Sequence, residues 1–148
     1  MALFNAFNIS ASGMTAQRYR TDIISQNVAN VDTTRTADGT PYRRKIVTFT
    51  EKTNTPFSHV LARAADTHTR GTGVKVSSLT EDTQTDMKRV YEPSNPDADE
   101  NGYVAYPNVN IITEMTNMID ATRSYEANVT AFTATKSMAV KGLDIGRN

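Results

Sequence analysis

The sequence contains no cysteine, and its basic and acidic residues balance, with 16 Lys and Arg against 16 Asp and Glu in 148 residues. The absence of cysteine excludes thiolate metal sites, disulfide scaffolds and cysteine nucleophiles. A protein that gains affinity by releasing counterions from nucleic acid normally carries a basic excess, which this chain lacks. The composition therefore predicts no nucleic-acid partner.

Long apolar runs are also missing, so we expect no direct membrane insertion. The N-terminal stretch has no Lys or Arg before Arg18 and no long apolar segment, so we expect no cleaved secretory signal.

Sequence motifs typical of enzymes do not occur. No serine lies in a G-x-S-x-G elbow, and no glycine-rich phosphate loop is complete. The two histidines, His59 and His68, lie at a spacing that does not bring metal ligands together, and we expect them to be solvated loop residues. The sequence predicts a protein that is not an enzyme and binds no cofactor or metal.

Charge and proline are concentrated in the middle of the chain. Residues 1–31 contain three charged side chains, and all 5 prolines lie within residues 32–107. Because proline interrupts helices and marks turns, the flanks favour long helices and the middle favours short strands. We therefore predict an α+β fold with long N- and C-terminal helices that form a coiled-coil-like pair around a small antiparallel β-rich insert. The predicted segments are a helix over 1–31, a β-rich section over 32–107 and a helix over 108–148.

The insert contains four strand candidates, bounded by turn residues such as the Asp38-Gly39 pair. They are residues 42–50, 74–80, 87–91 and 103–106.

The C-terminal flank has apolar residues at heptad spacing, which is typical of helices that pack along their length. One row is Ile111, Met118, Tyr125, Phe132 and Ala139, and the other is Met115, Thr122, Val129, Lys136 and Leu143. Either Asn108 or Asn110 is suited to cap the start of this helix.

The N-terminal flank repeats the pattern more weakly and leaves two interpretations open. The helices could form an antiparallel pair inside an ordinary α+β domain, or they could pack against other subunits. Sparse charge on the first helix favours the second interpretation, because a helix that is apolar or small all round requires burial on most sides. The predicted assembly interface consists of Leu3, Phe7, Met14, Ile24, Val28, Val31, Ile111, Met115, Met118, Tyr125, Val129, Phe132 and Leu143.

The acidic stretch at residues 97–102 has two interpretations. Asp97, Asp99, Asn101 and Gly102 match the first half of an EF-hand calcium loop, but Asn108 stands where such a loop needs a bidentate Glu. The alternative is a structural turn that leads into the strand at 103–106. The missing Glu favours the turn.

Several segments carry a family resemblance. Residues 25–34, with Asn27, Ala29, Asn30 and Thr33, resemble the N-terminal signature of the bacterial flagellar axial proteins, the rod and hook family. Further matches follow at residues 41–45, at residues 91–104 and from Pro107 through the C-terminal helix. The stretch from Tyr91 to Val109 narrows the resemblance to proximal rod members. Another rod-type axial protein of the same family is the alternative.

The resemblance implies a structural subunit of the flagellar basal-body rod, the drive shaft that transmits motor torque for motility. Its terminal helices are expected in the inner layer of a helical assembly. The implied partners are other copies of itself, other rod proteins and the flagellar type III export apparatus. The implied location is the rod that crosses the periplasm and cell wall, reached without a cleaved signal peptide.

Overall fold

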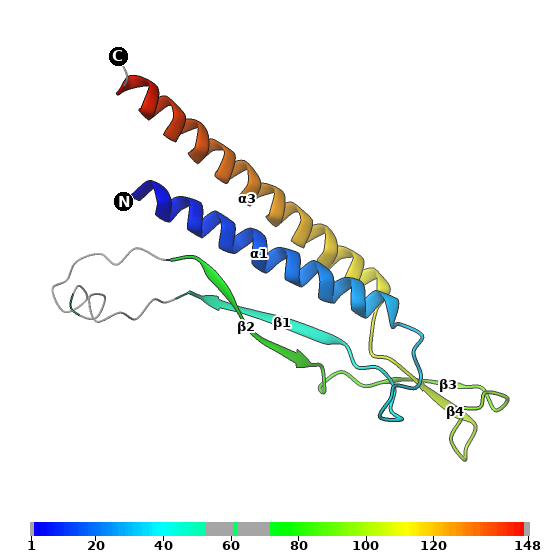
Figure 1. The fold of residues 1–148 in the computed structure, drawn as a ribbon. Helices are drawn as coiled ribbons and strands as arrows, with labels where there is room; N and C mark the ends of the chain where they lie inside the picture. Colours follow the sequence, from blue (N-terminus) through cyan, green and yellow to red (C-terminus); the bar gives the residue numbers. More distant parts are fainter. Residues whose placement is uncertain (1, 53–60, 62–71, 147–148) are drawn as a thin grey trace. The chain divides into compact units, whose positions relative to one another are not determined.

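The computed structural model describes residues 2–52, 61 and 72–146 (Figure 1). The described elements are two long helices and four short strands. In chain order they are α1 (Ala2–Ala29), β1 (Lys45–Glu51), β2 (Val74–Glu81), β3 (Lys88–Tyr91), β4 (Tyr103–Tyr106) and α3 (Ile111–Ile145). The expectation for His59 and His68 lies outside the described residues.

The chain divides into two compact units, and each contains a part of both terminal helices. Unit 1 comprises residues 1–19, 49–77 and 122–148, and unit 2 comprises residues 20–48 and 78–121.

In unit 1 the two helices contact through aromatic and small residues. The rings of Phe7 and Phe132 lie 4.9 Å apart between centroids. Gly13 brings the α1 backbone so close to α3 that a methyl group there would lie 2.6 Å from Oδ1 of Asn128. The backbone N–H of Val74 donates to Oγ of Ser12 at 3.0 Å, which attaches the start of β2 to α1. Glycine at position 13 is therefore a packing requirement of the helix pair.

In unit 2 the two helices, β4 and the segment before β1 all contribute buried residues. The fully or nearly fully buried apolar side chains are Ile24, Tyr42, Val104 and Ala121. β3 and β4 form an antiparallel hairpin in which Lys88 is opposite Tyr106 and Tyr91 is opposite Tyr103.

The strands form two separate two-stranded sheets, β1 with β2 and β3 with β4. For the first sheet, the N–H of Lys52 donates to the carbonyl of Gly73, and the N–H of Asp82 donates to the carbonyl of Arg44. These bonds join the end of one segment to the start of the other, so the pair is antiparallel.

Both helix ends that lead to the middle section are stabilised by asparagine. Oδ1 of Asn110 accepts hydrogen bonds from the N–H groups of Ile112 and Thr113 at 3.0 and 3.3 Å, which makes Asn110 the N-cap of α3. Nδ2 of Asn30 donates to the carbonyl of Gln26 at the end of α1. Of the two predicted caps, Asn110 is therefore the one that caps α3.

The predicted α+β fold, with paired terminal helices and antiparallel strands between them, is confirmed. The structure adds that the strands form two sheets. In the structure α3 begins at Ile111, three residues after the predicted start. Asn108 lies before the helix because its side chain donates a hydrogen bond to the carbonyl of Asp82. Among the described helices, none combines the length and the apolar character needed to cross a membrane.

The turn before β4 predicts unequal effects of two glycine substitutions. Gly102 and Gly39 have φ of +77° and +76°, a region in which a side chain costs about 1 to 2 kcal/mol. A methyl group on Gly102 would also lie 2.9 Å from the Tyr91 ring and 3.2 Å from Pro93, whereas one on Gly39 meets nothing within 4 Å. We expect Gly102→Ala to lower the free energy of unfolding more than Gly39→Ala, as measured by urea denaturation. Equal losses would show that the contacts with Tyr91 and Pro93 do not constrain this turn.

Candidate functional site

The side chain of Asn27, at 1% exposure, uses all of its hydrogen-bonding capacity in unit 2. Its Oδ1 accepts from the N–H of Lys45 and from the hydroxyl of Tyr42, at 2.9 and 2.8 Å. Its Nδ2 donates to the carbonyl of Lys45 and to Oε2 of Glu114, both at 2.9 Å. The amide thus pairs with both backbone groups of Lys45 as a neighbouring strand residue would, and it attaches α1 to the start of β1.

Glu114 is a carboxylate that unit 2 buries almost completely, at 1% exposure. Its Oε1 accepts from Nε and Nη2 of Arg44 at 2.9 and 2.7 Å and from Nδ2 of Asn117 at 3.2 Å. A buried ion is tolerated only when it is paired and hydrogen-bonded, and both oxygens of Glu114 meet that condition. Burial, followed by the negative charges of Glu114 and Glu81, raises the pKa of the neighbouring Tyr42 hydroxyl.

A second asparagine continues the network from Arg44. Oδ1 of Asn108 accepts from the backbone N–H of Arg44 at 2.9 Å. Its Nδ2 donates to the carbonyls of Asp82 and Thr85 at 2.9 and 3.2 Å. We call Asn27, Tyr42, Arg44, Asn108 and Glu114 the buried polar cluster.

Asp82 forms the edge of this cluster. Its carboxylate accepts from the N–H groups of Gln84 and Thr85 and from the Thr85 hydroxyl, and it lies 3.9 Å from Nη1 of Arg44. The hydrogen bonds from the Thr85 backbone and hydroxyl are the main reason that the pKa of Asp82 lies below its ordinary value.

The four motif residues predicted from the sequence have different surroundings. Asn27 lies at the centre of the buried polar cluster, whereas Ala29 is exposed. Oδ1 of Asn30 accepts from the hydroxyl of Thr33 at 3.2 Å, and the N–H of Thr33 donates to the carbonyl of Asn30. Asn30 and Thr33 therefore form the turn that ends α1.

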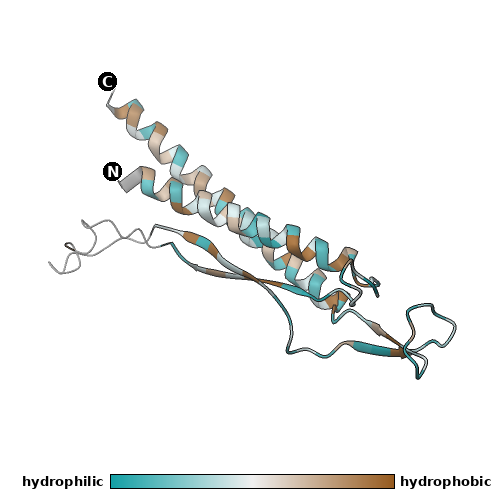
Figure 2. Cartoon of the chain, turned by 60° about the horizontal axis from the view of Figure 1, so that its bottom comes forward, coloured by the Kyte–Doolittle hydropathy of each residue, from teal (hydrophilic) through white to brown (hydrophobic). Residues whose placement is uncertain are grey.

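The most buried residues of α3 follow a heptad spacing that differs from both predicted rows. Glu114, Ala121 and Thr135 are buried and Asn128 is half-buried. This row lies one residue before the predicted row of Met115, Thr122, Val129, Lys136 and Leu143, all of which are exposed. α3 thus directs a largely polar and small row inward and leaves larger apolar side chains exposed. Coloured by hydropathy, both terminal helices carry hydrophobic and hydrophilic residues along their whole length (Figure 2).

The residues of the predicted assembly interface fall into four groups. Ile24 alone among the described members is buried. The half-buried group is Phe7, Met14, Val28, Val31, Met118 and Phe132. Within this group the rings of Phe7 and Phe132 contact each other. The exposed group is Ile111, Met115, Tyr125, Val129 and Leu143. Leu3 lies in α1, but its side chain is outside the described part of the chain.

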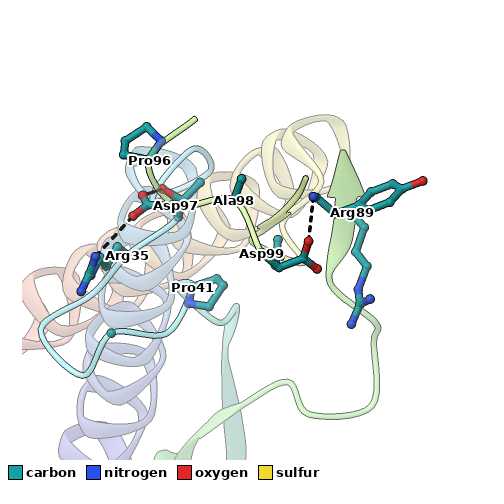
Figure 3. A pocket seen from close by; sticks show the side chains of 11 residues that line it. Arg35, Pro41, Arg89, Pro96, Asp97, Ala98 and Asp99 are labelled. Atoms are coloured by element: carbon teal, nitrogen blue, oxygen red, sulfur yellow. Dashed lines mark hydrogen bonds and ion pairs between the residues drawn. The ribbon is translucent and has the colours of Figure 1, made fainter. Parts of the chain in front are cut away.

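The carboxylates of the acidic stretch are used in contacts with the protein itself (Figure 3). Asp97 accepts from the Thr34 hydroxyl at 2.7 Å and lies 3.6 Å from Arg35. Oδ1 of Asp99 accepts from the N–H groups of Asn101 and Tyr103, both at 2.9 Å. Over residues 2–52, 61 and 72–146, no group of three or more acidic or histidine side chains is placed to hold a metal ion. These contacts are those of a turn that leads into β4.

Sequence patterns did not single out the residues that surround Asn27. Tyr42 and Arg44 belong to the strand candidate 42–50, and Glu114 to the segment after Pro107 that matches the family. Periodicity describes one helix and does not identify partners 70 or 87 residues away. The one available signal was an acidic residue in the first turn of a helix whose neighbouring positions are largely apolar.

Two family models match the chain. Residues 7–35 match the model described as Flagella basal body rod protein, and residues 100–145 match Flagellar basal body rod FlgEFG protein C-terminal. The first match contains Asn27, and the second contains Asn108 and Glu114. The matched segments therefore meet in the buried polar cluster.

Curated relatives match nearly the whole chain. It is 46% identical to the flagellar basal-body rod protein FlgC of Bacillus subtilis, over 99% of this chain and 100% of that protein. It is 43% identical to the FlgC protein of Borreliella burgdorferi, over 98% of both chains. The FlgC protein of Salmonella typhimurium is also 43% identical, over 99% of this chain and 100% of its own length.

The buried polar cluster predicts a large cost for removing its carboxylate. Glu114→Ala should lower the free energy of unfolding by about 3 kcal/mol, the lower end for breaking a buried ion pair, because Arg44 is partly exposed and can be hydrated. Glu126→Ala removes an exposed carboxylate from the same helix and should change stability by less than about 0.5 kcal/mol. Urea denaturation followed by circular dichroism measures both.

A double-mutant cycle with Asn27→Ala provides a second check. Because Asn27 and Glu114 share a hydrogen bond, their combined loss should be smaller than the sum of the single losses, by at least about 0.5 kcal/mol. Additive losses would contradict the direct coupling.

The lowered pKa of Asp82 predicts a pH-dependent contribution to stability. A carboxyl group whose folded-state pKa is depressed stabilises the fold above its unfolded-state pKa, and this contribution disappears as the pH falls through the folded-state value. Asp82→Ala should therefore destabilise most at pH 7, and its difference from the unaltered protein should shrink with acidification below the ordinary pKa of 3.8. Asp82→Asn keeps an acceptor oxygen but cannot titrate, so it separates the hydrogen bonds from the charge. A difference that grows on acidification would refute the assignment.

Proposed function

We propose that this chain, which belongs to the family of flagellar basal-body rod proteins FlgC, enters the rod through exposed apolar faces of its two terminal helices. Members of this family are structural subunits, and the chain is a structural subunit of the flagellar basal-body rod and not an enzyme. Its family implies assembly with other rod proteins. The proposal concerns which surfaces perform that assembly.

The observation that carries the proposal is a run of exposed apolar side chains along one side of α3. We call it the α3 apolar face, and it consists of Ile112, Met115, Ile119, Val129, Val140 and Leu143. At about 100° per residue these positions lie within about 140° of one another around the helix. Exposed apolar side chains that gather on one side of a helix are typical of a protein–protein interface.

The inward row of α3 supports the same assignment. Because Glu114, Ala121, Asn128 and Thr135 contact the rest of the chain, the larger apolar residues are left for other contacts. Met115 is 57% exposed and Leu143 is 75% exposed, although both are apolar. Burial of each such side chain in an assembly is favourable by roughly 1.5 to 3 kcal/mol.

α1 contributes a second apolar surface. Phe4 and Ile9 are exposed, and the helix has no charged side chain before Arg18. A helix with an uncharged first half and exposed apolar side chains favours contacts with neighbouring helices.

The finer placement of the chain is part of the same proposal and rests on the family. We infer that the partners are other copies of this chain and neighbouring rod proteins in the proximal rod, a drive shaft that crosses the periplasm. We infer delivery through the flagellar type III export apparatus from the family resemblance alone. The segments 1–31 and 108–148 would form the inner layer, with 32–107 outside it.

A charge placed on the α3 apolar face tests the assembly surface. Met115→Asp should abolish motility and incorporation into the rod, because assembly would have to desolvate a carboxylate. Met115 is exposed in the single chain, so export of the variant and its circular dichroism should remain unchanged. Motility in soft agar, rod content of purified basal bodies and secreted subunit are the measurements.

The matched control introduces the same charge at the same end of the helix. Thr113 is also exposed and lies about 160° around the helix from Met115. Thr113→Asp should leave motility largely intact. Equal motility defects from the two variants, or normal motility with Met115→Asp, would refute the assigned face.

A further inference from the structure

Unit 2 contains a pocket of about 580 Å³ at the start of α3. We call it the α3-start pocket. Its apolar lining includes Val31, Val90, Tyr106, Pro107, Ile111 and Ile112, and its charged lining is Asp32, Lys88 and Glu92. Ile112 is 78% exposed and also belongs to the α3 apolar face, so the pocket is continuous with the proposed assembly surface.

The pocket has charges of both signs that the described part of unit 2 does not neutralise. Oε2 of Glu92 accepts from the Tyr106 hydroxyl and from Asn95. Neither Asp32 nor Lys88 forms an ion pair with any residue in the described ranges. The pKa of Tyr106 is raised, first by its hydrogen bond to Glu92, then by burial and by the charges of Glu92 and Asp32. The pocket therefore suits an apolar segment that carries one cation and one anion.

We propose that the α3-start pocket binds the C-terminal end of α3, residues 138–145, from a second copy of this chain. Val140 and Leu143 of that segment are exposed apolar side chains that can enter the pocket. Lys141 and Asp144 are neighbours on the helix at a spacing of three. Lys141 is the complement of Asp32, and Asp144 is the complement of Lys88.

The N-terminal end of α1 is the other exposed apolar end in unit 1, but its lack of charge makes it a poorer match for the α3-start pocket. The beginning of α1 presents Phe4 and Ile9 but has no charged side chain over residues 2–17. Its insertion would leave Asp32 and Lys88 without complements. The C-terminal end of α3 supplies both.

The geometry of a rod favours a contact between two different surfaces. A contact that uses the same patch on both copies closes into a dimer, whereas a contact between two distinct patches can continue into a filament. The α3-start pocket and the end of α3 belong to different units of the chain. This inference rests on the proposed function, because it names the occupant of one part of that assembly surface.

Engineered disulfides test the contact directly, since the chain has no cysteine of its own. In cells that assemble rods, Ile112→Cys combined with Leu143→Cys should give a ladder of covalent oligomers after mild oxidation. The two positions are about 46 Å apart along one helix, so they cannot join within a chain. Basal bodies separated by non-reducing electrophoresis show the result.

The controls separate this contact from general proximity in the rod. Ile112→Cys with Ala134→Cys should give no ladder, because Ala134 is exposed but lies outside residues 138–145 and about 120° and 180° around the helix from Val140 and Leu143. A motile strain without a ladder from the Leu143 pair would overturn the inference and leave the proposed function standing. Dimers alone, or a ladder only when Val129→Cys replaces Leu143→Cys, would also overturn it.

Charge reversal provides a readout that does not depend on the cysteine variants. Asp32→Lys should reduce incorporation into the rod several-fold, and addition of Lys141→Asp should restore it. Failure of the second change to restore incorporation would contradict the pairing. Failure of the proposed function is recognised separately, by normal motility with Met115→Asp.

Discussion

The burial of one carboxylate imposes the arrangement of unit 2. Glu114 is almost inaccessible to water, and a buried ion is several kcal/mol unfavourable unless cationic and amide donors surround it. Arg44, Asn27 and Asn117 meet that requirement. Because Asn27 belongs to α1, Arg44 precedes β1 and Glu114 belongs to α3, satisfying the carboxylate brings these three segments together.

The asparagines turn this electrostatic requirement into a specific geometry. Asn27 pairs with both backbone groups of Lys45, and Asn108 joins the Arg44 N–H to two carbonyls near Asp82. An amide rotated by 180° would oppose donor to donor and acceptor to acceptor, so only one orientation satisfies all partners. Hydrogen bonds of this kind select one register between segments, whereas apolar packing tolerates several.

A polar interior has a consequence at the surface of α3. The inward row includes Glu114, Asn128 and Thr135, while Met115, Val129 and Leu143 remain in water. This distribution is unfavourable for an isolated monomer but suits a subunit that assembles with others. The chain belongs to such a family, the flagellar basal-body rod proteins. The contacts inside the chain then supply specificity, and we infer that the apolar residues outside supply association between copies.

The sequence by itself determined the two long helices, the strand-rich middle and the family, because periodicity, proline placement and the Asn27–Thr33 motif are local properties. It also indicated that Asn108 or Asn110 caps α3. Only the tertiary structure decided that Asn110 is the cap, that the strands form two sheets and that the inward row of α3 begins at Glu114 rather than Met115. The physical reason is distance along the chain. Heptad spacing identifies rows but not their orientation, which depends here on an ion pair and amide hydrogen bonds between residues 70 and 87 positions apart.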